Sequence, residues 1–161
     1  MLVELEVVQV SMDPFMSSPV LVLRDPASDR RIVARLGQTE AVALLSVMEK
    51  ISLDCPSAHD LALSLLEATG GRLQRVEIER RGETRTCATV VVADRDGRER
   101  RLSARVVDGV AMALRSAIPI HADDSLLEAA TELDANPCSE WHGPADLLEA
   151  LPDEEFPKYK M

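Results

Sequence analysis

The first part of the chain alternates apolar and polar positions and is rich in β-branched residues, a pattern typical of β-strands. It predicts strands at Leu2–Val10, Val20–Arg24 and residues 30–36, separated by segments rich in Pro, Ser and Asp. Because these connections are too short for crossovers, the three strands are predicted to form an antiparallel meander.

The apolar positions then change to a helical period. One helix is predicted from about Gln38 to Ile51, with Glu40 in its first turn, where the helix dipole favours an acid. A second is predicted from about Ala58 to Thr69, with Gly70-Gly71 as its stop signal. The predicted buried stripes are Ala41, Leu44, Leu45, Met48 and Ile51 in the first helix, and Ala58, Leu61, Ala62, Leu65, Leu66 and Thr69 in the second.

The second half of the chain returns to strand patterns and ends in helical ones. Strands are predicted at Arg72–Arg80, Thr84–Ala93 and Arg98–Val106, followed by a helix at about Gly109 to Ala117 and a short strand at 119–121. Two more helices are predicted, at DDSLLEAATEL, capped by Asp123 or Asp124, and at ADLLEAL, opened by Pro144.

This order of elements predicts an α+β fold, with helices packed on a largely antiparallel or mixed sheet of about six strands. We expect residues 1–122 to form the α+β domain. Residues 123–161 are expected to form an acidic helical extension packed on that domain or on a neighbouring subunit.

Composition narrows the class of protein. Aromatic residues make up only 2% of the chain, so there is no aromatic platform on which nucleic-acid bases could stack. Three widely spaced cysteines without a CxxC motif argue against a disulfide framework or a zinc site. The apolar runs are too short for a membrane span and the N-terminus does not read as a signal peptide, so a cytoplasmic protein is expected.

The net charge of −10 is unevenly distributed. Residues 122–161 carry 11 acids and 2 bases, a net charge of −9, whereas residues 72–105 carry 10 arginines and 6 acids, a net charge of +4. A locally basic sheet could hold a phosphate backbone. Alternatively, the arginines solvate exposed strands and pair with Glu77, Glu79, Glu83 and Glu99.

His59 and Asp60 stand together at the start of the second predicted helix. The segment Ser57-Ala58-His59-Asp60 fits a capping box, with Ser57 as N-cap and Asp60 reaching back to its amide. This local role explains Asp60 and leaves His59 only partly explained.

Three further polar residues lie in or just before the third predicted helix. Asp108 follows a strand and precedes GVAMALRSA, so it is predicted to be an N-cap. Arg115 lies near the C-terminal end of that helix, where a cation is favoured. Arg105 alternates with Arg101 and Ser103 along a strand, where it could simply be solvated.

Common catalytic motifs do not occur in the sequence. We find no HExxH, GxSxG, GxGxxG or phosphate-cradling Gly-Lys motif. Asp94-x-Asp96-Gly97 lacks the remaining ligands of a calcium loop and is interpreted as a hairpin turn.

Taken together and in order, several segments resemble the bifunctional nuclease domain family. They are LVELEVVQV and SPVLVLRD, the Gly37-x-x-Glu40-Ala41 turn, the His59-Asp60-Leu61 helix start, LLEATGGRLQRVEI, the block from Asp96 to Ile120, and the terminal FPKYKM. The resemblance implies an α+β fold, association as a homo-oligomer (a dimer or trimer), and nuclease activity on RNA and DNA. The chain departs from the family pattern at Val106-Val107, where Pro-Ser is usual, and at Gly109, where alanine is usual.

The positions that match the recurrent polar pattern of the family are Glu40, His59, Asp60, Arg105, Asp108 and Arg115. If the three helix starts converge, Glu40, Asp60 and Asp108 are expected to hold Mg²⁺ or Mn²⁺ for phosphodiester hydrolysis. His59 would then act as general acid or base, and Arg105 and Arg115 would clamp the phosphate.

Two rival hypotheses remain. In one, the protein is a non-catalytic oligomeric module in which the same residues are caps and salt bridges. In the other, it binds a small anion at its helix N-termini without chemistry.

Overall fold

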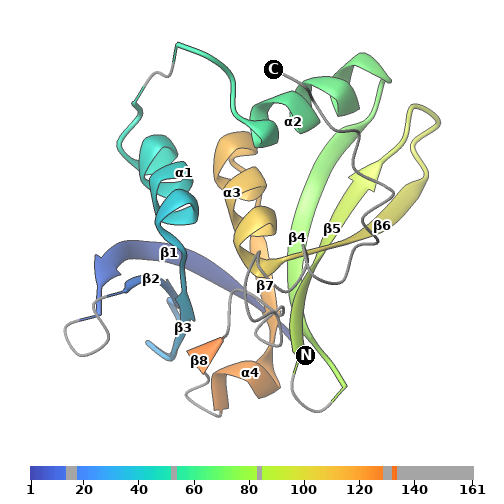
Figure 1. Ribbon diagram of the computed structural model, residues 1–161. Helices are drawn as coiled ribbons and strands as arrows, with labels where there is room; N and C mark the ends of the chain where they lie inside the picture. Colours follow the sequence, from blue (N-terminus) through green and yellow to red (C-terminus); the bar gives the residue numbers. More distant parts are fainter. Residues whose placement is uncertain (14–17, 52–53, 83–84, 129–131, 134–161) are drawn as a thin grey trace, which may run out of the picture.

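The computed structural model describes residues 1–13, 18–51, 54–82, 85–128 and 132–133 of the chain. Within these residues one mixed sheet has eight strands in the order β6-β5-β4-β7-β1-β2-β3-β8, with helices packed against it (Figure 1). The predicted α+β class is therefore confirmed. The strands are β1 (Leu2–Met12), β2 (Pro19–Arg24), β3 (Arg31–Arg35), β4 (Arg72–Arg81), β5 (Arg85–Ala93), β6 (Glu99–Ala104), β7 (Ile120–Asp123) and β8 (Glu132–Leu133).

The predicted meander is confirmed. β1 pairs antiparallel with β2 and β2 with β3, and β4–β5–β6 forms a second antiparallel set. The two sets are joined through β7, which runs antiparallel to β1 and parallel to β4. This central strand is the short one predicted at 119–121, displaced toward Asp123.

Four helices occur in the described part of the chain: α1 (Gln38–Met48), α2 (Ala58–Ala68), α3 (Val106–Ser116) and α4 (Asp124–Glu128). Figure 1 shows α1 and α3 side by side on one face of the sheet, with α2 near one end of α3. The buried core lies mostly between α3 and the strands, and Val110, Val76 and Ile78 in it are fully buried. None of these helices is long and apolar enough to span a membrane.

The helix ends follow local chemistry. Ser57 accepts a hydrogen bond from the Asp60 amide and Asp60 accepts one from the Ser57 amide, so the predicted capping box is confirmed. α2 ends at Ala68, and Gly70, directly after the C-cap Thr69, has a φ of 78° in the left-handed region, as the glycine pair predicted. α1 ends at Met48, earlier than predicted, because Lys50 takes a left-handed φ of 53° and the Ile51 amide bonds back to the Ser46 carbonyl. Ile51 is therefore exposed, whereas the sequence predicted it to be buried.

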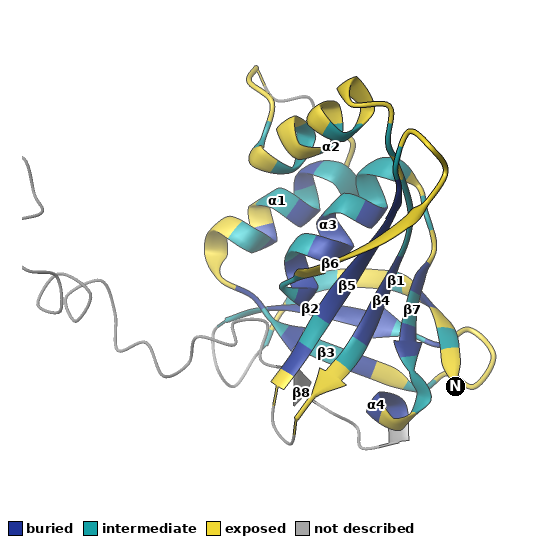
Figure 2. Ribbon diagram, turned by 90° about the vertical axis from the view of Figure 1, so that its right-hand side faces the viewer, coloured by how far each residue is buried: buried dark blue, intermediate teal, exposed yellow. Residues whose placement is uncertain are grey.

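The predicted buried stripe of α2 is wrong except at Leu66, which packs against the core. No residue of α2 is fully buried, and the side that faces the protein carries His59, Leu63 and Leu66. Leu61 and Leu65, predicted to be buried, are 57% and 59% exposed. Figure 2 shows α2 in the colours of exposed and intermediate residues. The reason is tertiary: α2 is oriented by polar contacts of its first turn with α3, described below, and not by its apolar stripe.

α3 begins three residues earlier than predicted. Arg105 takes the N-cap position, Val106 and Val107 form the first turn and are buried, and Asp108 is a first-turn residue and not the cap. The prediction that β6 extends to Val106 is accordingly wrong, since Arg105 and Val106 already belong to the helix start.

The predicted C-terminal extension is described only at its beginning. Of the helix predicted at DDSLLEAATEL, α4 covers the first half, whereas Glu132–Leu133 pairs in parallel with β3. The available edge of β3 explains this difference, because it offers backbone hydrogen bonds that a helix would not use. The predicted helix at ADLLEAL lies outside the described residues.

Gly109 stands where the family resemblance leads us to expect alanine, and the packing of α3 explains the glycine. A Cβ at this position would lie 2.8 Å from the Cβ of Ala88 and 3.0 Å from Cγ1 of Val76. α3 therefore packs so closely on β4 and β5 that its first turn has no room for a methyl group.

We predict that Gly109→Ala destabilises the protein by about 1–2 kcal/mol, although alanine is the better helix former, because overpacking outweighs a propensity gain of up to about 1 kcal/mol. Urea unfolding measures the difference. The control is a double-mutant cycle with Ala88→Gly, which reopens the space: Gly109→Ala should cost at most half as much in the Ala88→Gly background as in wild type. An unchanged or higher stability of Gly109→Ala would contradict the packing argument.

Candidate functional site

The acids at the three helix starts occupy equivalent positions. Glu40, Asp60 and Asp108 are each the third residue after the N-cap of their own helix. This position suits an acid because the helix N-terminus carries a partial positive charge and unpaired amides. Glu40 and Asp60 each accept a hydrogen bond from the N-cap amide, at 2.7 Å from Gly37 and 2.8 Å from Ser57. The sequence thus places one carboxylate at each helix start, and only the fold decides what else it meets.

Arg105 joins two of these carboxylates. Its Nη1 donates to Oε1 of Glu40 at 2.7 Å, and its Nε and Nη2 donate to Oδ2 and Oδ1 of Asp108 at 2.7 and 3.0 Å. Two parallel bonds to one carboxylate form the bidentate geometry that a guanidinium favours. The pKa of Arg105 is raised above its ordinary value, first by the hydrogen bond to Asp108. The alternative of a simply solvated strand arginine is therefore wrong for Arg105.

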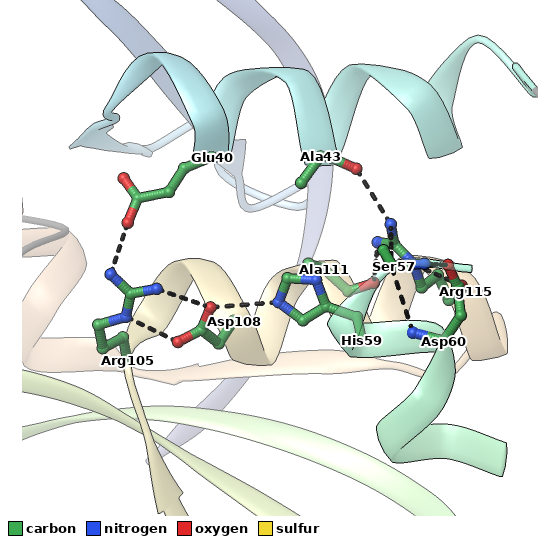
Figure 3. A network of polar contacts seen from close by, with 9 residues as sticks. All are labelled: Glu40, Ala43, Ser57, His59, Asp60, Arg105, Asp108, Ala111 and Arg115. Carbon is green, nitrogen blue, oxygen red and sulfur yellow. Dashed lines mark hydrogen bonds and ion pairs between the residues drawn. The ribbon is translucent and has the colours of Figure 1, made fainter. Parts of the chain in front are cut away.

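His59 extends this group onto α2. Its Nε2 lies 3.1 Å from Oδ1 of Asp108, and Figure 3 shows the imidazole pointing from α2 toward that carboxylate. The hydrogen bond to His59, followed by those from Arg105, lowers the pKa of Asp108 to about 2, against the opposing effect of burial. Asp108 is thus a carboxylate at neutral pH, held between an imidazole and a guanidinium.

Asp60 and Arg115 form a second, neighbouring group. Nε of Arg115 donates to Oδ1 of Asp60 at 2.9 Å, and its Nη2 donates to Ser57 Oγ at 3.3 Å and to the Ala43 carbonyl at 3.4 Å. Hydrogen bonds from the Ser57 hydroxyl and amide, and then from Arg115, lower the pKa of Asp60. The Arg115 side chain is only 7% exposed, so it ties α1, α2 and α3 together from within.

The structure thus brings four of the predicted site residues into one continuous group, Glu40, Arg105, Asp108 and His59, and places Asp60 and Arg115 beside it (Figure 3). We call the first group the His59 network and the second the Arg115 network. The sequence suggested each residue but gave no signal that Arg105 would separate Glu40 from Asp108.

The three acids do not form one set of metal ligands. Glu40 and Asp108 face each other across the Arg105 guanidinium, and Asp60 bonds to Ser57 and Arg115. Within the residues that the structure describes, no group of three or more His, Cys, Asp or Glu side chains is arranged to hold a metal ion. A dication between Glu40 and Asp108 would have to displace Arg105, so this donor set does not fit Mg²⁺ or Mn²⁺, and the metal stays a prediction.

An open pocket of about 420 Å³ adjoins the Arg115 network. Asp60 and Arg115 form part of its wall. Sequence reasoning missed its other lining residues, because they come from the end of α1 and the segment after it, whose path depends on the left-handed Lys50. They are Ser46, Val47, Lys50, Ile51, Cys55 and Pro56.

The strand arginines pair as the second interpretation of the charge pattern predicted. Glu77, only 6% exposed in its side chain, lies between Arg75 at 2.7 Å and Arg101. Glu99 pairs with both of these arginines, and Glu79 with Arg81. These contacts engage Arg75, Arg81 and Arg101, whereas the predicted partner Glu83 lies outside the described residues. The His59 network is the better candidate for chemistry. The turn interpreted at Asp94-x-Asp96-Gly97 is also confirmed, since Asp94 accepts bonds from the amides of Asp96 and Arg98.

The model of the bifunctional nuclease domain matches residues 21–134, which include all four helices and every residue of both networks. The chain belongs to the bifunctional nuclease domain family, as its resemblance implied. It is also similar to two uncharacterised proteins of Mycobacterium tuberculosis, from strains CDC 1551 and H37Rv. Each is 30% identical to it over 157 residues, which cover 98% of this chain and 90% of the relative.

We predict that Asp108→Asn lowers the free energy of unfolding at pH 7 by up to about 2 kcal/mol, the value of a pKa shift from 3.8 to about 2. Because the pKa of Asp108 is depressed in the folded state, its contribution is present above about pH 4 and is lost as the pH falls toward 2. The difference between wild type and variant should therefore shrink toward zero between pH 4 and pH 2, as measured by urea unfolding at each pH. Asp54→Asn, at an exposed position, is the control. A difference that is constant with pH would contradict this role of Asp108.

We predict that Arg115→Met destabilises the protein by about 2 kcal/mol, since it removes the enclosed donor that joins Asp60 of α2 and the Ala43 carbonyl of α1 to α3. Thermal unfolding measures the loss. The matched control is Arg81→Met, which removes an exposed ion pair and should change stability by less than about 0.5 kcal/mol. Equal effects of the two changes would show that Arg115 does not hold the helices together.

Proposed function

We propose that the protein is a nuclease that hydrolyses phosphodiester bonds in RNA or DNA, and that His59, Asp108 and Arg105 carry the reaction. Membership of the bifunctional nuclease domain family supports the class of reaction. The observation that carries the assignment of residues is the contact of His59 Nε2 with Asp108 at 3.1 Å, on a carboxylate that Arg105 also binds.

His59 is the general base of this proposal. With Nε2 bonded to Asp108, the other ring nitrogen, Nδ1, takes the proton of the water that attacks phosphorus. Asp108 orients the imidazole and stabilises the imidazolium that forms, the role of the aspartate in a Ser-His-Asp triad. The P–O ester bond breaks on the opposite side of phosphorus, where a solvent water protonates the leaving oxygen. The imidazolium then loses its proton to solvent, so the base is regenerated.

Arg105 supplies the positive charge that the phosphate needs. Its side chain is 41% exposed, in contrast to the enclosed Arg115, so it can be reached by a substrate. Glu40 holds Arg105 through Nη1 alone, whereas Asp108 holds it through two bonds. A phosphate oxygen that replaces Glu40 would therefore gain the guanidinium without disturbing the His59–Asp108 pair.

A second candidate function is that of a non-catalytic, homo-oligomeric interaction module. It is favoured by the completeness of the pairing in both networks, which suits a purely structural role, and by the apolar side chains that α2 exposes. In that case the His59 network would only fix the helices, and no phosphodiester would be cleaved.

We predict that His59→Ala and Asp108→Asn each reduce the cleavage rate at least 100-fold, the usual contribution of a general base or of the group that orients it. The assay uses matched single-stranded RNA and DNA oligonucleotides with protein freed of contaminating nucleases. The effect should fall on kcat, because both residues act on the reacting atoms.

Two controls define the outcome. His121→Gln changes a histidine of β7 that belongs to neither network and should leave the rate unchanged. EDTA tests the metal independently. Full activity in EDTA supports the proposed chemistry. Loss of activity in EDTA that Mg²⁺ or Mn²⁺ restores would show that the reaction needs a bound metal ion and would contradict it. Wild-type protein that cleaves neither substrate, or variants as active as wild type, would favour the interaction module.

A further inference from the structure

The facing ends of β4 and β5 carry three arginines, which we call the hairpin cluster. Arg80 and Arg81 close β4, Arg85 opens β5, and all three are exposed. Arg81 pairs with Glu79 at 3.7 Å, between two exposed side chains. In the part of the chain that the structure describes, the side chains of Arg80 and Arg85 have no hydrogen-bond or ion-pair partner. Two guanidiniums are therefore available to an anion.

This arrangement of charge is unfavourable in the absence of an anion. The register of the sheet places Arg81 directly opposite Arg85, and like charges in that position destabilise a pair of strands. The acids at the matching end of β7 are already engaged, since Asp124 pairs with Arg30 at 2.7 Å and Asp123 bonds to its own turn. Residues 79–85 keep a net positive charge even when both glutamates of the segment are counted.

The hairpin cluster lies toward the end of the sheet at which β6 turns into α3. Ala104, the last residue of β6, is opposite Ala88, and Arg105 follows it as the N-cap of α3. Arg85 lies three residues from Ala88 along β5, which is about 10 Å. The other end of these strands, with the turn between β5 and β6, lies close to α2 (Figure 1).

Arg80 is on the face of the sheet that carries the helices. Val76 and Ile78 are fully buried in the core on that face, and alternate side chains along a strand share a face. The partner of Arg80 in register is Thr86, the neighbour of Arg85. Positive charge therefore continues from the His59 network toward the hairpin end.

A single strand of nucleic acid has the matching chemistry. Its nucleotides rise by about 3.4 Å each when stacked, so a distance of about 10 Å corresponds to about three nucleotides. A guanidinium binds phosphate oxygens strongly and in a defined geometry. Phosphate contacts position a strand without reading its sequence, which suits a chain with only 2% aromatic residues on which bases could stack.

We propose that Arg80 and Arg85 bind phosphates of a single-stranded RNA or DNA about three nucleotides away from the phosphate that Arg105 holds. The substrate is then a polynucleotide strand recognised by its backbone, and not a dinucleotide or another small phosphodiester. This inference rests on the proposed function, because it takes the phosphate at Arg105 as its reference point.

Binding of a strand that resists cleavage tests this role. The probe is a fluorescently labelled phosphorothioate oligonucleotide of about 12 thymidines, titrated with the full-length protein at several salt concentrations. Arg80→Gln/Arg85→Gln should weaken binding at least fivefold at about 50 mM salt. It should also reduce the slope of log affinity against log salt by about 1.4, the value of two lost contacts to a single strand.

The matched control is Arg72→Gln/Arg98→Gln. Both arginines are exposed, and their side chains have no ion-pair partner among the described residues. They lie near Ala93, about 26 Å along β5 from Arg85. This control should change the affinity less than twofold.

Two further measurements separate binding from structure and from chemistry. Arg80→Lys/Arg85→Lys keeps the charges and should bind within threefold of wild type. In the cleavage assay, Arg80→Gln/Arg85→Gln should raise KM for a 12-nucleotide substrate at least fivefold and leave kcat within twofold, because contacts far from the reacting atoms are the same in the ground state and the transition state.

Equal effects of the two glutamine pairs, or a wild-type protein that does not bind the probe, would overturn the inference. Loss of cleavage in His59→Ala together with unchanged binding by Arg80→Gln/Arg85→Gln would remove this subsite and leave the nuclease proposal intact. The expected binding results together with full cleavage by His59→Ala would instead contradict the proposed catalytic residues and leave a strand-binding surface.

Discussion

The arrangement of this protein depends on charge compensation at the starts of α1, α2 and α3. Each start presents unpaired amides and the positive end of a dipole, and burying it without counter-charge would be unfavourable. Glu40, Asp60 and Asp108 supply the negative charge. Arg105 links Glu40 to Asp108, and Arg115, near the C-terminal end of α3, links Asp60 to α3. The helices can therefore pack closely because their polar ends are joined by ion pairs as well as by apolar contact.

The two arginines that compensate these charges have different roles, one in stability and one in the proposed chemistry. Arg115 is enclosed and bonds to groups of all three helices, which is the arrangement of a residue that maintains the fold. Arg105 is partly exposed, and Asp108, which it binds, also bonds to the imidazole of His59. The capping of α2 does not require this histidine. His59 is thus the residue of the network for which local structure gives the least explanation. For that reason the proposed function rests on it.

α2 shows how a polar contact can override an apolar pattern. Its hydrophobic stripe would ordinarily face the core, but His59 and Asp60 fix the helix with that stripe outward. The cost of exposing Leu61 and Leu65 is offset by the polar contacts of the first turn and by the packing of Leu66 against the core.

The sequence by itself determined what local physics controls. Strand alternation, the Ser57 capping box and the Gly70 helix end were predictable, because each depends on residues a few positions apart. The individual site residues were also recognisable, since acids at helix starts and a histidine without a local role are visible in a single sequence and match a known family. The sequence could not give the partners of those residues.

Only the tertiary structure decided that Arg105 lies between Glu40 and Asp108, that Arg115 is enclosed, and that α2 turns its leucines outward. It also decided the central place of β7 and the end of α3 at which Gly109 must pack on Ala88. These features join segments that are distant in the chain. They depend on how charged groups pair and side chains pack between distant segments. The spacing of residues within one segment does not determine those contacts.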